Sequence, residues 1–405
     1  MNNKNLFESF SGRPPHPYGD VGIDLIKTKR MPAALDWLDK PLDLRETHRI
    51  ASEKIDYAIS PIFQAGRAAL ITGTGGSSKS TLLKKLAIIV TTGRSDLGLS
   101  VQKAGKAVLI LAEDTAEDAH RSLEAIFQSM NLSEEEVALV HERLYIFAAA
   151  GRDCVIVSTS DSVDDKKPQR LEKLLQFIMQ LGDVRLVGLD PAIALSRGRE
   201  LDEVAQRDLA NAVEKIAITT GASVIVISHA AKSIQFQQEI GSHASRGSGA
   251  ITDAFRLELL MRVMTAKEAK SFQIDEHQRH RYVRMQVTKA NSLPPELMHP
   301  AWLERINGGA LKLVKLAPAS VTRTRGALEL FVEADPETGE LVPTSMSFST
   351  WKLKALDAGL LTGATDSARD MSARRLLATI KSSKWVVDTQ GIWKPTELGV
   401  NEISR

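Results

Sequence analysis

Residues 73–81 combine glycines, hydroxyl side chains and one lysine in a run that is typical of phosphate binding. Backbone N–H groups of such a loop can curl around a phosphate chain because glycine has no side chain to block the approach. The Lys79 ammonium would reach the β- and γ-phosphates, and the Ser80 hydroxyl would bind Mg²⁺. We therefore predict a nucleotide phosphate site formed by Gly73, Thr74, Gly75, Gly76, Ser77, Ser78, Lys79, Ser80 and Thr81.

The flanking residues give this loop the context that a Walker A motif requires. The apolar run 68–72 predicts a buried strand before the loop, and a helix is expected from Ser80 to about Thr92. The helix dipole would add to the attraction for phosphate. Ser78 departs from the pattern, since glycine is usual there, and a positive φ at Ser78 would carry strain. A chance glycine–serine turn is the alternative, which the strand before and the Lys-Ser-Thr sequence after disfavour.

Acidic residues end two further apolar runs. Asp190 closes the run 186–190 in the form of a Walker B motif and would hold Mg²⁺ through water. This signal gains weight from its presence in the same domain as the loop, because many strands end in aspartate. Glu113 and Asp114 follow the run 107–112, and Glu113 is favoured as the group that polarises the attacking water. The alternative is an ordinary helix cap by Asp114 or Thr115.

A polar segment follows the apolar run 223–227. His229 could sense a γ-phosphate by hydrogen bonding, and a purely structural role is equally open. Residues 230–249 then predict a mobile loop with amide and cationic donors suited to a nucleic-acid backbone. A plain surface loop is the equal alternative. The candidate DNA-binding residues in it are Lys232, Gln235 and Arg246.

Short apolar runs alternate with amphipathic helical stretches between residues 61 and 315. Runs at 68–72, 107–112, 144–148, 184–189 and 223–227 predict buried strands. Before the last of these, a helix over 202–220 would place Val204, Leu209, Val213 and Ile216 roughly on one face, and Gly221 would end it. This alternation predicts an α/β fold with a parallel sheet covered on both faces.

Composition shifts suggest four parts to the chain. We predict an N-terminal arm and helical lead-in over 1–60, a core domain over 61–315, a linker over 316–345 and a small module over 346–405. Helices are expected at 349–361 and 366–381, followed by a hairpin around 388–391, which suits a winged-helix-like module. Basic residues cluster between 369 and 384, where contact with nucleic acid and docking of a partner are equally open.

The overall composition narrows the classes of function. The 405 residues are 43% hydrophobic and 25% charged, and their net charge of +2 gives no overall basic field. Cys154 is the single cysteine, so an internal disulfide is excluded, which fits a reducing compartment. The sequence shows no signal peptide and no run of about 18 apolar residues that would span a membrane. We therefore expect a soluble cytoplasmic protein without a membrane partner.

An ordered series of short motifs resembles the RecA-fold hexameric helicases of the plasmid RepA type. The resemblance covers roughly residues 60–315, including the spacing from Glu113 through Asp190 to His229. Its most specific stretches are 244–249, 252–256, 264–269, 275–279, 282–284 and 287–291. It implies a RecA-like P-loop core and a ring of six chains that moves along single-stranded DNA using ATP and Mg²⁺.

The same resemblance implies roles for single residues. It assigns Glu113 as the catalytic glutamate, Asp190 as the Mg²⁺-holding aspartate and His229 as the γ-phosphate sensor. It assigns Arg256 as an arginine finger that enters the neighbouring subunit's site, where such a group can contribute on the order of 10³–10⁵ in rate. Lys289 falls where related helicases place a second cation that acts on the neighbour. The loop 231–247 matches the channel region that faces DNA.

Three functions compete at this point. The first is a ring-forming DNA helicase that replicates a plasmid or other mobile element, with replication-initiation or primase partners. The second is an ATP-dependent DNA-binding switch that does not unwind DNA. The third, a small-molecule kinase, would need an arginine-rich lid in the same chain. The polar 231–249 loop and the finger-like Arg256 disfavour it.

Overall fold

The computed structural model describes residues 42–158, 167–197, 203–229, 249–291, 293–335, 338 and 341–403. The chain separates into a unit that ends at Ile55 and a second unit from Asp56 onward, and each is described by itself. In the first unit, the short helix η3 (Leu44–Glu46) leads into α1 (Thr47–Ser52). Neither helix buries a side chain. Their ion pairs are exposed, so they contribute little to stability.

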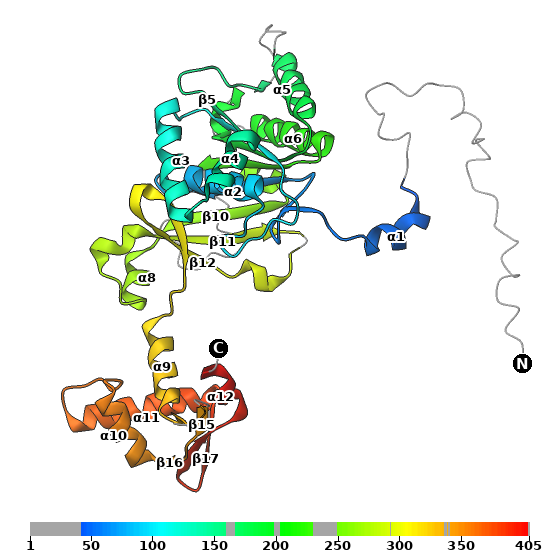
Figure 1. The fold of residues 1–405 in the computed structure, drawn as a ribbon. Helices are drawn as coiled ribbons and strands as arrows, with labels where there is room; N and C mark the ends of the chain where they lie inside the picture. The colour runs from blue at the N-terminus through cyan, green and yellow to red at the C-terminus, as the bar shows by residue number, and fades with distance from the viewer. Residues whose placement is uncertain are drawn as a thin grey trace, which may run out of the picture. The chain divides into compact units, whose positions relative to one another are not determined.

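The second unit is built on a sheet that has nine strands among the described residues, in the order β13-β12-β11-β10-β3-β9-β7-β4-β5 (Figure 1). Six neighbouring strands are parallel: β3 (Ala68–Gly73), β4 (Lys106–Leu111), β5 (Leu144–Ala148), β7 (Val184–Asp190), β9 (Ser223–His229) and β10 (Leu257–Val263). These strands confirm the predicted α/β fold with its parallel sheet.

Three antiparallel strands extend this sheet beyond β10. They are β11 (Tyr282–Ala290), β12 (Ala301–Arg305) and β13 (Leu311–Val314). The sequence did not predict this extension. Buried and more exposed positions alternate along much of β11, so it lacks the continuous apolar run that marks the strands buried on both faces.

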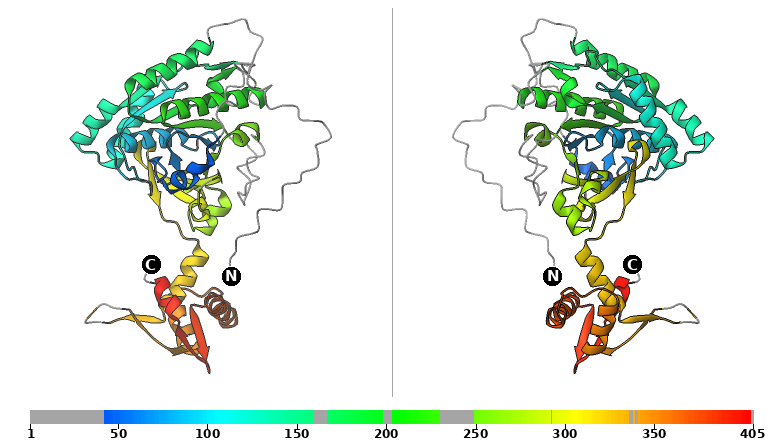
Figure 2. Two further views of the ribbon diagram at one scale, coloured as in Figure 1. Left: turned by 90° about the vertical axis from the view of Figure 1, so that its right-hand side faces the viewer. Right: turned by 90° about the vertical axis from the view of Figure 1, so that its left-hand side faces the viewer.

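Side chains on the two faces of the parallel strands enter two separate hydrophobic clusters. Ile71 and Ile225 face the layer of α2 (Lys79–Thr92), α3 (Ala116–Met130) and α4 (Glu134–Arg143). Leu70 and Val224 face the layer of α5 (Lys167–Leu181), α6 (Glu203–Thr220) and α7 (Gly249–Ala254). The green helices α5 and α6 lie on the side of the sheet opposite α2 (Figure 2). The strands are therefore buried on both sides, as predicted.

One helix face was predicted incorrectly. Leu209, Val213 and Ile216 of α6 are buried, but the side chain of Val204 is 63% exposed. Val204 precedes Leu209 by five residues, which at about 100° per residue turns it roughly 140° away from the buried stripe.

Shorter elements join these layers. The short strands are β1 (Tyr57–Ile59), β2 (Phe63–Gln64), β6 (Val157–Ser158) and β8 (Ser196–Arg197). The short helices are η4 (Ala192–Ala194), α8 (Ala266–Ser271), η7 (Glu276–Arg281), η8 (Pro295–Met298) and η9 (Asn307–Gly309). In the part of the chain described, no helix is both long and apolar enough to cross a membrane.

The C-terminal residues form a module with its own hydrophobic cluster. Its helices are α9 (Ala319–Glu329), α10 (Phe348–Asp357), α11 (Asp366–Ser382) and α12 (Glu397–Ile403). Its strands are β14 (Val332–Ala334), β15 (Leu341–Pro343), β16 (Met346–Ser347), β17 (Val386–Thr389) and β18 (Ile392–Pro395). The helices α10 and α11 and the β17–β18 hairpin confirm three predicted elements.

The segment 316–345 was predicted as a linker, but the structure folds part of it. Residues 319–329 form α9, and Ala327, Leu328 and Phe331 are fully buried in the cluster around Trp351. The Trp351 indole N–H donates to the Ala327 carbonyl oxygen at 3.1 Å. The polar composition of the segment hid these apolar positions. The domain boundaries at residues 60, 315 and 345 stay predictions.

Candidate nucleotide-binding site

The glycine-rich loop lies between the end of β3 at Gly73 and the start of α2 at Lys79. This strand, loop and helix confirm the predicted context. A Cβ atom at Gly73 would overlap the Met261 carbonyl oxygen on β10, so a side chain has no room there. Ser78 adopts φ 65° and ψ 29°, which is the left-handed conformation that glycine adopts without strain. Ser78 therefore has the positive φ that carries strain in a residue with a side chain.

Lys79 directs its charge into the loop. Its Nζ atom donates hydrogen bonds to the carbonyl oxygens of Gly73 at 2.9 Å and Thr74 at 3.0 Å. Burial lowers the pKa of this ammonium group, while the charges of Asp190 and Glu113 act in the opposite direction. A buried cation held against the loop backbone is suited to an incoming phosphate chain.

Asp190 and Ser80 meet at the edge of the sheet where the parallel strands end, which we call the carboxyl edge. Asp190 ends β7, and β9 alone separates β7 from β3 in the sheet. Burial raises the pKa of Asp190, which is 8% exposed. The Ser80 hydroxyl acts on the Asp190 carboxylate by lowering its pKa, whereas the nearby Asp114 and Glu113 raise it.

These two oxygen ligands fit a Mg²⁺ ion bound together with a nucleotide. Mg²⁺ keeps several waters and takes one or two protein ligands plus phosphate oxygens, so a dedicated cage of acids is not required. The described residues hold no cluster of three or more histidine, cysteine or acidic side chains that could bind a metal ion.

The two acids after β4 take different positions. Asp114 pairs with the buried ammonium of Lys84 at 2.6 Å, and Thr115 caps α3 by accepting from the Asp118 N–H. Glu113 is exposed, and it makes no hydrogen bond or ion pair within the described part of the chain. Its charge still acts on Lys79 and Asp190. Of the two acids, Glu113 is therefore the one left available at the loop.

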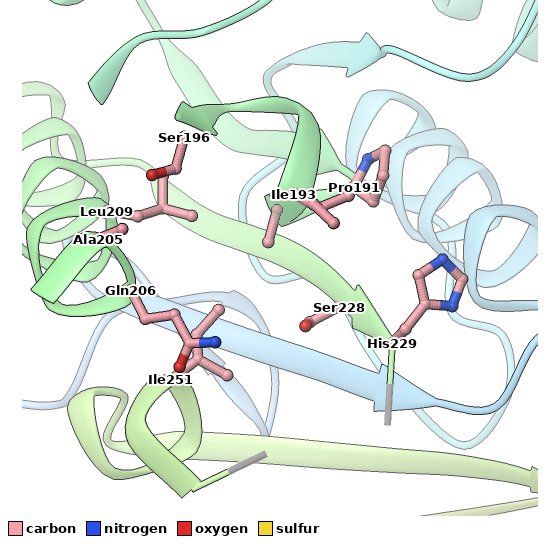
Figure 3. A pocket seen from close by; sticks show the side chains of 10 residues that line it. Pro191, Ile193, Ser196, Ala205, Gln206, Leu209, Ser228, His229 and Ile251 are labelled. Carbon is pink, nitrogen blue, oxygen red and sulfur yellow. The ribbon is translucent and has the colours of Figure 1, made fainter. Parts of the chain in front are cut away.

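His229 ends β9 directly beside the loop. The strand register pairs His229 with Gly73, the last residue of β3. His229 and Ser228 line a small cavity of about 40 Å³, together with Pro191 and Gln206 (Figure 3). Because His229 ends β9, it lies at the carboxyl edge together with Lys79 and Asp190. Its side chain is exposed. Its proposed contact with a γ-phosphate stays a prediction.

A larger cavity of about 650 Å³ adjoins the loop on the β10 side. Its lining residues are Thr74, Gly75, Gly76, Val263, Met264, Thr265, Ala266, Lys267, Arg279, His280 and Arg305. This volume falls within the usual range of small-molecule sites. Three of the lining residues are lysine or arginine and none is acidic, so the cavity suits an anionic ligand such as a nucleotide.

Arg305 is a contact of this loop that sequence reasoning missed. It ends β12, and its guanidinium donates to the Ser78 hydroxyl at 2.8 Å and to the Gly76 carbonyl oxygen. No motif surrounds Arg305 in the sequence. The one available signal was the unexplained serine at position 78, which indicated that this loop differs from the usual pattern.

Arg256 and Lys289 lie away from the loop. Arg256 immediately precedes β10. Because Glu258 of β10 pairs with Leu70 of β3, Arg256 lies beside the first residue of β3. It lines a cavity with Ala68 and Ser223, the first residues of β3 and β9. Six residues of β3 separate this amino edge from the loop, a span of roughly 17–20 Å at about 3.3 Å per residue. Arg256 therefore does not reach the loop of its own chain.

Lys289 lies close to Arg256. Its Nζ atom donates to the carbonyl oxygens of Thr252 at 2.9 Å and Asp253 at 3.0 Å, at the end of α7. The candidate DNA contacts Lys232, Gln235 and Arg246 lie outside the described residues.

The parallel sheet, the loop between β3 and α2 and the acid that ends β7 give the chain an α/β core with the arrangement of a P-loop nucleotide-binding domain. Residues 38–235 match the family model described as an AAA domain. A solved structure titled "Crystal structure of the RadB recombinase" is similar to the chain at 14% identity. The match covers 62% of this chain and 93% of that chain with a TM-score of 0.40.

Proposed function

We propose that the chain is an ATP-driven, ring-forming helicase that translocates on single-stranded DNA during replication of a plasmid or other mobile element. The proposal rests on the sequence resemblance and on one structural observation. The P-loop lies at the carboxyl edge of the sheet, whereas Arg256 and Lys289 lie at the amino edge. A site that uses both sets of residues therefore requires two chains.

Within one chain, the carboxyl edge supplies the groups that bind the nucleotide. Lys79 neutralises the β- and γ-phosphates, and Ser80 with Asp190 holds Mg²⁺, which stabilises negative charge on the phosphates. Glu113 orients the attacking water, and His229 contacts the γ-phosphate. Arg256 of a neighbouring chain completes the site and stabilises charge in the transition state.

Mixing two inactive variants tests the shared site. Lys79→Ala removes the phosphate contact, and Arg256→Ala removes the finger, so each variant alone should lose ATP hydrolysis. In a random 1:1 mixture, about a quarter of the interfaces pair an intact Lys79 with an intact Arg256, so hydrolysis should partly recover. No recovery at any ratio, while the mixed chains still associate, would overturn the role of Arg256 in the neighbour's site.

A DNA-dependence experiment tests the substrate. The ATPase rate is measured with and without single-stranded DNA at stated salt, alongside the mass of the assembly, because phosphate contacts weaken steeply as salt rises. Stimulation by single strands in an oligomer of several chains is expected. A monomeric ATPase that ignores DNA would reject the proposal and favour a small-molecule kinase.

The C-terminal module supports a second candidate, an ATP-dependent DNA-binding switch without unwinding activity. The module has its own core, and α11 exposes Arg374, Arg375 and Lys381. Displacement of a strand from forked DNA separates the two candidates. Unwinding supports the helicase, whereas hydrolysis stimulated by DNA without strand displacement supports the switch.

A further inference from the structure

Ser78 holds a backbone conformation that favours glycine. Its φ of 65° lies in the left-handed region, where a Cβ atom crowds the following backbone. Such strain persists where surrounding contacts fix the conformation. The loop therefore needs a contact that glycine would not need, and the Ser78 hydroxyl is the group that glycine lacks.

Arg305 provides that contact from a distant strand. Its Nε atom donates to Ser78 Oγ at 2.8 Å, one terminal nitrogen donates to the His280 carbonyl oxygen at 2.9 Å, and the other donates to the Gly76 carbonyl oxygen. The sheet brings Arg305 to the carboxyl edge. Glu304, which precedes Arg305 on β12, pairs with Tyr282 at the start of β11. The next residue of β11, Val283, pairs with Val263 at the end of β10.

The partners of Arg305 are neutral. Within the described part of the chain, no carboxylate forms an ion pair with its guanidinium, and burial lowers its pKa. Arg305 is half-buried, and its hydrogen bonds to the loop are made without an acid. Here the guanidinium holds two groups of the phosphate loop, the Gly76 carbonyl oxygen and the Ser78 hydroxyl.

We propose that Arg305 is a positioning residue of the phosphate loop and that Ser78 is its acceptor. The hydrogen bond from Arg305 to Ser78, which we call the clasp, takes the place of the usual glycine. Fixing these two groups holds the backbone of the loop, with its N–H groups, in one conformation before phosphate binds, which reduces the ordering required on binding. This inference rests on the proposed function, since it assumes that the loop binds ATP.

A double-mutant cycle on the full chain tests the clasp. The dissociation constant of ATP with Mg²⁺ is measured for the wild type, Ser78→Ala, Arg305→Met and the double variant. Loss of one such hydrogen bond should weaken binding by about 3- to 10-fold in each single variant. The double variant should be no weaker than Arg305→Met alone, because Ser78 acts only through Arg305. Arg305→Lys should recover part of the affinity, since an ammonium still donates to the Gly76 carbonyl oxygen.

Matched controls separate positioning from folding. Arg281→Met removes an exposed arginine at the end of η7 that pairs with Glu304, and it should leave ATP affinity unchanged. Ser78→Gly removes the hydroxyl together with the strain, so it should bind ATP more tightly than Ser78→Ala. If Arg305→Met does not fold, the comparison of Ser78→Ala, Ser78→Gly and Arg305→Lys carries the test.

Two outcomes overturn the clasp. Additive effects of the two substitutions would do so, as would wild-type affinity in Ser78→Ala. A wild-type chain that fails to bind ATP would instead reject the proposed function, so the two failures can be told apart.

Discussion

The Thr72 hydroxyl on β3 donates a hydrogen bond of 2.8 Å to the carboxylate of Glu258 on β10. Thr72 immediately precedes Gly73, the first glycine of the phosphate loop. Thr288 on β11 donates to the same carboxylate at 2.7 Å, and Thr252 on α7 donates at 3.3 Å. Glu258 is 3% exposed. One buried carboxylate thus joins the strand that leads into the loop to the helix that precedes Arg256.

Replacing Glu258 should destabilise the fold. Glu258→Leu leaves three buried hydroxyl groups without this acceptor, and the expected cost is about 2–4 kcal/mol in the free energy of unfolding. Glu258→Gln keeps the shape and one carbonyl acceptor, so its cost should be smaller. Denaturant unfolding measures both, with the half-buried Glu304→Gln, whose carboxylate pairs with the exposed Arg281, as the control. A Glu258→Leu variant as stable as the control would contradict the importance of this network.

The two acids after β4 should respond differently to loss of charge. Glu113→Gln should lower the rate of ATP hydrolysis by about 10²- to 10⁴-fold and leave ATP affinity nearly unchanged, because a water-orienting group acts in the chemical step. Asp114→Asn should instead lower stability by about 2 kcal/mol, since it leaves the buried Lys84 without its partner. Steady-state kinetics and thermal unfolding of both variants check the assignment. The reverse pattern would make Asp114 the base.

Gly188 allows α2 to approach the strand that carries Asp190. A Cβ atom at Gly188 would lie 2.5 Å from Leu109 Cδ2 and 2.9 Å from both terminal carbons of Leu83. Gly188→Ala should therefore cost about 1–3 kcal/mol through overpacking. A Cβ atom at Gly75 meets no atom within 4 Å, so Gly75→Ala is the control for stability. Equal unfolding free energies for the two variants would show that the site can relax.

Glu268 should make stability depend on acid pH. Burial raises the pKa of this carboxyl, but hydrogen bonds from Arg262 and Thr265 outweigh burial and hold the pKa at about 2, below the ordinary 4.5. Because the folded pKa is depressed, the stabilisation is present above about pH 4.5 and is lost as pH falls toward about 2. It amounts to about 3 kcal/mol at neutral pH.

Glu268→Gln provides the comparison. The variant should be less stable than the wild type near neutral pH, and the difference should shrink steadily as the pH is lowered below about 4.5. Unfolding free energies measured across this range test the prediction. A difference that does not change with pH would assign the loss to packing of the amide and not to the charge.

The sequence predicted those parts of the site that chemistry ties to local spacing. The phosphate loop has to follow a strand and precede a helix, and Asp190 has to end an apolar run, so both could be placed from neighbouring residues. Arg305 could not, because 227 residues separate it from Ser78. Glu258 was missed for the same reason, since its threonine partners lie on three separate elements. The antiparallel strands β11–β13 were missed because their apolar residues are interrupted by polar ones.

The opposite positions of Arg256 and the phosphate loop also bear on the symmetry of the proposed assembly. If each chain offers its loop to one neighbour and its Arg256 to another, the contact is heterologous. Repeated by pure rotation it closes a ring, and repeated with translation it continues as a helix. In a closed ring every chain contributes to a complete site, whereas an open assembly always leaves one terminal loop without an arginine.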